Sequence, residues 1–165
     1  MRLSSRYGTH LPVLMQAIYK TKGTVLELGV GPYSTPILHR LCALEGRHVL
    51  SVDNSPEFYG WAKRYESRLH RVVLVEDWDK AKIEYAWDVA LVDHSPSERR
   101  VVEIHRLAKR VKYLVLHDAN GRYEAFYHYS KIYALFKYMI TFDDVEPSTV
   151  LLSNLVSLKD FWKRP

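Results

Sequence analysis

The sequence predicts a doubly wound α/β fold with one mainly parallel, seven-stranded sheet. Between residues 24 and 116, short apolar runs alternate with stretches of helical periodicity, which is typical of parallel strands covered on both faces. A turn containing two glycines joins the first run to the helix after it. The last two runs are joined by a connection too short to hold a crossover helix. We therefore expect a C-terminal antiparallel hairpin beside a parallel core.

The size and composition of the chain fit one globular domain. It has 165 residues, of which 47% are hydrophobic and 26% charged, and no apolar run approaches the length of a membrane span. The formal charge of +5 would attract an anionic partner without identifying one. The first residues contain no signal-peptide core, and the single cysteine, Cys42, is expected to be a buried apolar side chain. We expect a cytoplasmic protein that does not enter a membrane.

The first expected element is a helix that precedes the sheet, within residues 1–22. Apolar residues recur there at helical spacing, at positions Leu11, Leu14, Met15 and Ile18. Pro12 is acceptable in the first turn of such a helix. Residues 7–10, just before it, form a loop that either lines a ligand site or packs against the sheet. We expect residues 1–22 to belong to the same domain as the sheet.

The next expected unit is a strand, a glycine loop and a helix. The apolar run 24–28 suits a central parallel strand, and Gly29 and Gly31 supply backbone freedom and close approach where it ends. The helix that follows has suitable terminal residues: Ser34 or Thr35 as its cap, Pro36 in its first turn and Gly46 at its end. Such a turn presents free N–H groups to a nucleotide-like ligand.

The remaining elements continue the alternation. Further strands are expected over 47–52, 72–75, 89–92, 113–116, 138–142 and 149–152, and further helices over 55–69, 101–111 and 123–136. Right-handed crossovers place the carboxyl ends of all parallel strands at one edge of the sheet. That edge would carry the glycine loop and four carboxylates, those of Asp53, Asp77, Asp93 and Asp118. Ligands of open α/β sheets bind at this edge, so the carboxylates indicate the site.

The glycine loop carries a family resemblance. The residues Glu27-Leu28-Gly29-Val30-Gly31, with Ser34-Thr35 and an apolar helix after them, resemble the first motif of class I methyltransferases that use S-adenosylmethionine. The loop departs from the dinucleotide pattern because Ser34 takes the third small position and Pro32 interrupts it. The antiparallel pair after a parallel core also resembles the Rossmann-like sheet of that family, in which the last strand inserts beside the fifth. The resemblance implies that residues 23–165 form the S-adenosylmethionine-binding domain.

The resemblance also implies contacts to the cofactor. Asp53 would accept hydrogen bonds from the ribose hydroxyls, unless it only caps the helix after it, and Asn54 would support the adenosine. Asp77 would receive the adenine amino group, in competition with Glu76, and Trp78 would stack on the ring or simply pack. The full expected set is Glu27, Gly29, Gly31, Ser34, Asp53, Asn54, Asp77, Trp78 and Asp93, where Glu27 acts on the methionine part through water or backbone N–H groups and Asp93 receives its ammonium.

Two routes to catalysis are open. The segments around Asp93 and Asp118 resemble the metal-bearing strands of catechol-type O-methyltransferases, which implies Mg²⁺ bound by Asp93, Asp118 and Asn120. In this chain Asn120 is displaced by one position, and no lysine follows Asp93 where that group places its base. Alternatively, His94 or His117 removes the proton from an acceptor hydroxyl. The catalytic candidates are therefore Asp93, His94, His117 and Asp118.

The reaction expected first is methyl transfer to oxygen. The sequence Asp93-His94-Ser95-Pro96 differs from the Asp/Asn-Pro-Pro-aromatic sequence typical of amino-group methylation. We expect an S-adenosylmethionine-dependent methyltransferase whose acceptor is an oxygen of a small molecule or sugar. One alternative is an RNA or DNA methyltransferase that turns the basic residues Arg99, Arg100 and Arg106 towards phosphates. Another is a non-catalytic subunit that binds the donor. The sequence leaves the oligomeric state open.

Overall fold

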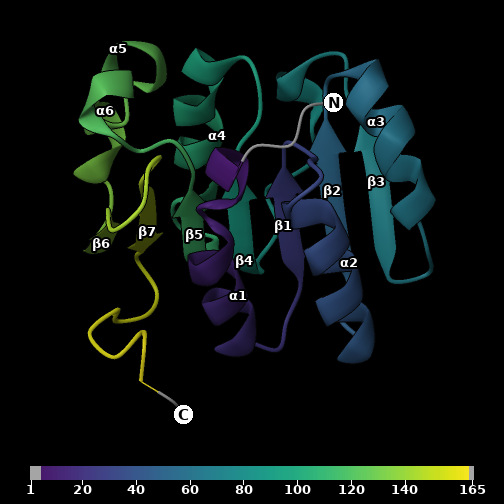
Figure 1. Cartoon of the computed structure of the whole chain (residues 1–165), viewed down its shortest axis with the longest axis horizontal. Helices are drawn as coiled ribbons and strands as arrows, with labels where there is room; N and C mark the ends of the chain where they lie inside the picture. The colour runs from purple at the N-terminus through teal and green to yellow at the C-terminus, as the bar shows by residue number, and fades with distance from the viewer. Residues whose placement is uncertain (1–4, 164–165) are drawn as a thin grey trace.

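A seven-stranded sheet in the order β3-β2-β1-β4-β5-β7-β6 organises the computed structural model, which describes residues 5–163 (Figure 1). The strands are β1 (Val25–Leu28), β2 (Val49–Asp53), β3 (His70–Leu74), β4 (Trp87–Val92), β5 (Val111–Leu116), β6 (Tyr138–Phe142) and β7 (Thr149–Ser153). The first five are parallel, and β7 runs antiparallel between β5 and β6. The predicted fold class, hairpin and position of the last strand are all confirmed.

Helices cover both faces because successive strand residues point to opposite sides. In β1, Val25 packs with α1 (Leu11–Tyr19) and α2 (Ser34–Leu44), which lie in front of the sheet in Figure 1. Its neighbour Leu26 belongs to the core on the other side, with residues of α4 (Arg100–Leu107) and α6 (Ser130–Tyr133). The sole cysteine, Cys42, is buried against the first of these cores, as predicted. None of the described helices is both long and apolar enough to cross a membrane.

Strand order reverses between β1 and β4, and this reversal places the site. The loop after β1 and the residues after β4 meet at the carboxyl edge of the sheet, where Gly29 has a φ of 92°. A Cβ added to Gly29 would lie 2.5 Å from the backbone oxygen of Asp93. Only glycine accommodates both the left-handed backbone and the close approach. The glycine predicted at the strand end is therefore required by the contact between two neighbouring strand ends.

Three local predictions need correction. The helix α2 begins at Ser34 itself, and Tyr33 precedes it without a side-chain cap, so neither Ser34 nor Thr35 caps it. The helix expected over 123–136 is divided into α5 (Glu124–Tyr127) and α6, because His128 between them adopts a left-handed φ of 53°. The helix expected over 55–69 is shorter, since α3 (Pro56–Ala62) tightens into the 3₁₀ turn η2 (Lys63–Tyr65) before β3. Ser55 caps α3 through a bond from the Phe58 N–H.

Candidate active site

A cavity of about 470 Å³ opens at the carboxyl edge of the sheet. Its wall contains the glycine-loop residues 30–34 and, after β4 and β5, the side chains of Asp93, His117 and Asp118. Arg100 at the start of α4 and residues of the loop before α1, including His10, complete it. The structure therefore gathers the predicted loop with three of the four predicted catalytic candidates.

The glycine loop rests on a buried hydrogen-bond network centred on Glu27 of β1. The Gly31 N–H donates to the Thr35 hydroxyl at 2.9 Å, and that hydroxyl donates to the Glu27 carboxylate at 3.0 Å. Ser51 of β2 donates another hydrogen bond to the same carboxylate. Burial raises the pKa of Glu27 from 4.5 to about 7, against the opposing effect of the hydroxyl donors. Glu27 does not line the cavity and therefore supports the loop indirectly, through Thr35.

Asp53 joins the glycine loop to the end of β2. One carboxylate oxygen accepts the Val30 N–H at 2.8 Å, and the other accepts the Ser55 N–H at 2.7 Å. Burial raises the pKa of Asp53, against these backbone donors. Each carboxylate oxygen retains a lone pair that can receive a further donor, so both the capping contact and the predicted ribose contact are chemically possible for one side chain.

Arg100 bridges the two aspartates that the sequence predicts as metal ligands. Its Nη2 lies 3.0 Å from Oδ1 of Asp93, and its Nη1 lies 3.5 Å from Oδ2 of Asp118. Burial alone would raise the pKa of Asp93, but Arg100 and His117 outweigh it and lower this pKa to about 2. Asp93 is therefore ionised, and its charge is balanced inside the protein.

His117 is held in its doubly protonated form by its neighbours. The Thr9 hydroxyl donates its proton to the Pro147 carbonyl at 2.7 Å, so it accepts from Nε2 of His117 at 3.0 Å. Nδ1 of His117 faces the ionised Asp93 at 3.2 Å and donates to it. Burial lowers the pKa of His117, but the hydrogen bond and charge of Asp93 outweigh burial and raise it. The imidazolium of His117 presents no basic nitrogen to the cavity.

The second predicted base, His94, is directed away from the cavity. Its Nε2 lies 3.1 Å from Oε2 of Glu103, and both side chains are fully buried. The Trp78 ring packs on the His94 ring at 4.1 Å between centroids, while the indole N–H donates to the Ser95 carbonyl. Burial lowers the pKa of His94, against the opposing effect of Glu103. Trp78 and His94 therefore form part of the packing under the site.

Three other predicted residues are engaged in local structure. The Asp77 carboxylate accepts the Asp79 N–H at 3.0 Å and so caps a 3₁₀ turn, η3 (Trp78–Lys80). The Asn120 carboxamide accepts the Ser148 N–H at 2.6 Å and donates to Glu146. Asn54, beside Asp53, is half-buried and does not line the cavity. The ligand set Asp93, Asp118 and Asn120 is thus not assembled, because Asn120 faces the loop before β7 and Arg100 lies between the aspartates.

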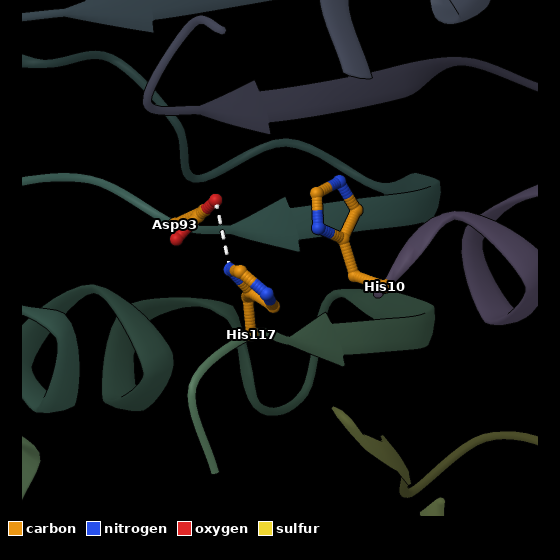
Figure 2. Close-up of side chains that lie close together, drawn as sticks. All are labelled: His10, Asp93 and His117. Carbon is orange, nitrogen blue, oxygen red and sulfur yellow. Dashed lines mark hydrogen bonds and ion pairs between the residues drawn. The ribbon is translucent and has the colours of Figure 1, made fainter. Parts of the chain in front are cut away.

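His10 is a site residue whose importance sequence reasoning missed. It immediately precedes α1, is 1% exposed and lines the cavity, and both of its ring nitrogens lack a hydrogen-bond partner among the described residues. Burial lowers its pKa to about 4, so the imidazole is neutral. Figure 2 shows its ring beside Asp93 and His117, which follow two different strands. The sequence indicates only that the loop 7–10 is a candidate for lining a site.

Comparisons with known proteins agree with this architecture. The chain matches no protein-family model and no curated protein. Among solved structures, it is similar to a METTL16 methyltransferase domain, with a TM-score of 0.61 and 15% identity over 89% of this chain and 82% of that one. It is also similar to the human methyltransferase 10 domain-containing protein (TM-score 0.58, 15% identity, 93% and 86% covered). A third is human methyltransferase-like protein 13 in complex with SAH (TM-score 0.61, 13% identity, 90% and 82% covered).

The fold is therefore that of class I S-adenosylmethionine-dependent methyltransferases. It is defined by the strand order, the antiparallel β7 beside β5 and the similarity to three methyltransferase domains. At identities of 12–15% the similarity establishes the fold alone.

The raised pKa of Glu27 predicts a specific pH dependence of stability. Because the folded state holds this proton up to about pH 7, whereas the usual value is 4.5, ionising Glu27 removes stability as pH rises through this window. The rise of this pKa from 4.5 to about 7 corresponds to about 3 kcal/mol. Relative to wild type, Glu27→Gln should therefore gain up to about 3 kcal/mol in free energy of unfolding between pH 4 and pH 8. Urea unfolding at both pH values measures this, and parallel pH profiles for the two proteins would contradict it.

Loss of Arg100 should be strongly destabilising. Arg100→Met leaves Asp93 and Asp118 without their buried counter-charge, which costs about 3–5 kcal/mol. The matched control is Arg122→Met, because Arg122 forms an exposed pair with Glu146 that contributes less than about 1 kcal/mol. Denaturant unfolding compares the two variants, and an equal loss of stability in both would show that the Arg100 bridge is not the structural centre of the site.

Proposed function

We propose that the chain is an S-adenosylmethionine-dependent methyltransferase that transfers a methyl group to an oxygen of a small molecule. The observation that carries the proposal is the shared cavity, in which the glycine loop after β1 faces the polar residues after β4 and β5. The fold similarity to methyltransferase domains, two of them in complexes with SAH, supports the choice of donor.

The donor contacts follow from the geometry of the loop. Asp53 already fixes Val30 and can receive the ribose hydroxyls with its remaining lone pairs. Gly31 and Ser34 line the cavity where the methionine part would lie. Glu27 acts through Thr35 on the loop, as a buried support for these contacts. Asp93 already pairs with Arg100 and His117. Its carboxylate would therefore bind the donor ammonium less strongly than an unpaired carboxylate would.

The size and lining of the cavity favour a small acceptor with a hydroxyl group. A volume of about 470 Å³ lies in the range of small-molecule sites, roughly 300–1,000 Å³. In the reaction, the acceptor oxygen forms a bond to the methyl carbon as the bond from that carbon to the donor sulfur breaks, and the hydroxyl proton is released to solvent. The protein aligns the two molecules and keeps water out. Mg²⁺ is not part of the proposal, because Asn120 of the expected ligand set is bound to Ser148 and Glu146 instead.

A nucleic-acid acceptor is the second candidate. One similar structure is a METTL16 catalytic domain in complex with MAT2A 3′UTR hairpin 1. In this chain, however, Arg99 forms ion pairs with Asp79 and Glu103, which reduce its availability to a phosphate group. The exposed Lys109 and Arg110 come just before β5 begins, at the edge of the sheet opposite to the cavity. Arg100 is the exception in this helical region, because it lines the cavity, but its charge is paired with Asp93 and Asp118.

Donor binding is the first test. Calorimetry should detect SAH and S-adenosylmethionine binding, with NAD a poor competitor, and Asp53→Ala should weaken SAH binding by more than about 1 kcal/mol through loss of charge-assisted hydrogen bonds. Asp160→Ala is the control, because Asp160 is an exposed carboxylate that pairs with Lys163 and does not line the cavity. Preferential NAD binding would reject the methyltransferase proposal, and equal weakening in both variants would move the ribose contact away from Asp53.

The acceptor class is the second test. With methyl-labelled donor and fractionated cell extract, label should appear in low-mass fractions as an alkali-stable product, as expected for a methyl ether. Asp53→Ala, assayed at the same donor concentration, should label these fractions less. Label that enters RNA or DNA and is released by nuclease would favour the second candidate. Donor binding without label in any fraction would favour the non-catalytic subunit.

A further inference from the structure

We propose that His10, Asp93 and His117 form a binding site for one divalent transition-metal ion of the zinc class. This site differs from the magnesium site expected from the sequence, because two of its three ligands are imidazole nitrogens and one comes from the loop before α1. It goes beyond methyl transfer and does not depend on it.

The three side chains converge from separate parts of the chain. One ligand atom from each lies within 4.8 Å of those of the other two, and Nδ1 of His117 is 3.2 Å from Oδ2 of Asp93. The rings of His10 and His117 lie 4.6 Å apart between centroids and are inclined at 67° (Figure 2). Zinc binds imidazole nitrogen at about 2.0–2.1 Å and carboxylate oxygen at about 2.0–2.2 Å. Ligand atoms within 4.8 Å of one another are close enough for one ion to lie between them after the side chains adjust.

His10 provides the independent observation that points to a ligand. An imidazole that is 99% buried normally has a hydrogen-bond partner, because an unpaired buried polar group costs free energy. Neither nitrogen of His10 has one among the described residues, although the ring lines the cavity. An imidazole nitrogen is the commonest protein ligand of such metals. A metal ion would satisfy the nitrogen that faces Asp93 and His117.

Neighbouring groups fix the orientation of two of the three ligands, His117 and Asp93. Nε2–H of His117 donates to the Thr9 hydroxyl, which leaves Nδ1 directed at Asp93. Such a second hydrogen bond fixes the tautomer and ring orientation of metal-binding histidines. Arg100 holds Oδ1 of Asp93 at 3.0 Å, which leaves Oδ2 on the side of His117. The metal ion would take the place of the Nδ1 proton of His117, and this proton would leave to solvent.

The donor set selects the type of metal. Two nitrogens and one carboxylate oxygen suit zinc and neighbouring divalent transition metals, whereas Mg²⁺ prefers oxygen ligands and retains waters. Replacing a proton of charge +1 with an ion of charge +2 adds one positive charge to a cluster in which Asp93, Asp118, Arg100 and His117 are balanced. The added charge and an open coordination position would face the cavity. An anionic oxygen ligand therefore fits this position best.

The test is direct titration of Zn²⁺ into the full chain, without a histidine tag and after chelator treatment. We expect one Zn²⁺ per chain, with affinity reduced at least about 10-fold in His10→Ala and in His117→Ala. His48→Ala is the matched control, because His48 is exposed and outside the cluster. Thermal unfolding of each variant shows whether it is folded, and failure of SAH binding in wild type would count against the methyltransferase proposal alone.

X-ray absorption of the wild-type chain loaded with Zn²⁺ provides a second readout, which does not depend on the folding of any variant. It should show nitrogen and oxygen ligands at about 2.0–2.2 Å with scattering from two imidazoles. The proposal would be overturned by absence of stoichiometric Zn²⁺ binding, by unchanged affinity in folded His10→Ala, or by loss in His48→Ala equal to that in His10→Ala. Binding of Mg²⁺ in preference to Zn²⁺, or a Zn²⁺ shell without imidazole, would overturn it as well.

Discussion

The buried charge of Arg100 is the constraint on which the candidate site depends. Its guanidinium reaches Asp93 after β4 and Asp118 after β5, donates to the Tyr129 hydroxyl and lies 4.5 Å from the centre of the Tyr127 ring. Asp93 is partly buried, and its pairing with Arg100 offsets the cost of removing its charge from water. The same contacts tie two strand ends to the aromatic segment that follows β5. Local folding of that segment and the electrostatics of the site are therefore linked.

The glycine loop is organised by a second buried carboxyl group. Glu27 lies under the loop and acts on Gly31 through the Thr35 hydroxyl, while Asp53 fixes Val30 from the neighbouring strand. The loop is thereby preorganised on one side of the cavity, as the Arg100 contacts preorganise the other. Two halves that are each rigid can bring a donor and an acceptor to a fixed separation, which is the main requirement for methyl transfer in a protein that supplies alignment.

The fold was predictable because its signals are local. Apolar strand runs, the glycine turn and the short hairpin connection are each visible in neighbouring residues. The shared edge at which the parallel strands end follows from right-handed crossover connections. The site was predictable only in part. In the sequence, Arg100 is one of several basic residues in a predicted helix. The inward orientation of its side chain depends on contacts with Asp93 and with an aromatic segment later in the chain. The contact of His10 with His117 joins residues more than one hundred positions apart, and no periodicity signals it.

A structure of the chain bound to SAH tests the central claim most directly. The account predicts the ribose hydroxyls against the Asp53 carboxylate, the sulfur facing the cavity wall formed by Asp93 and His117, and a glycine loop that keeps its hydrogen bond from Gly31 to Thr35. SAH bound away from the carboxyl edge of the sheet, or bound there without contact to Asp53 and the loop 29–34, would contradict it.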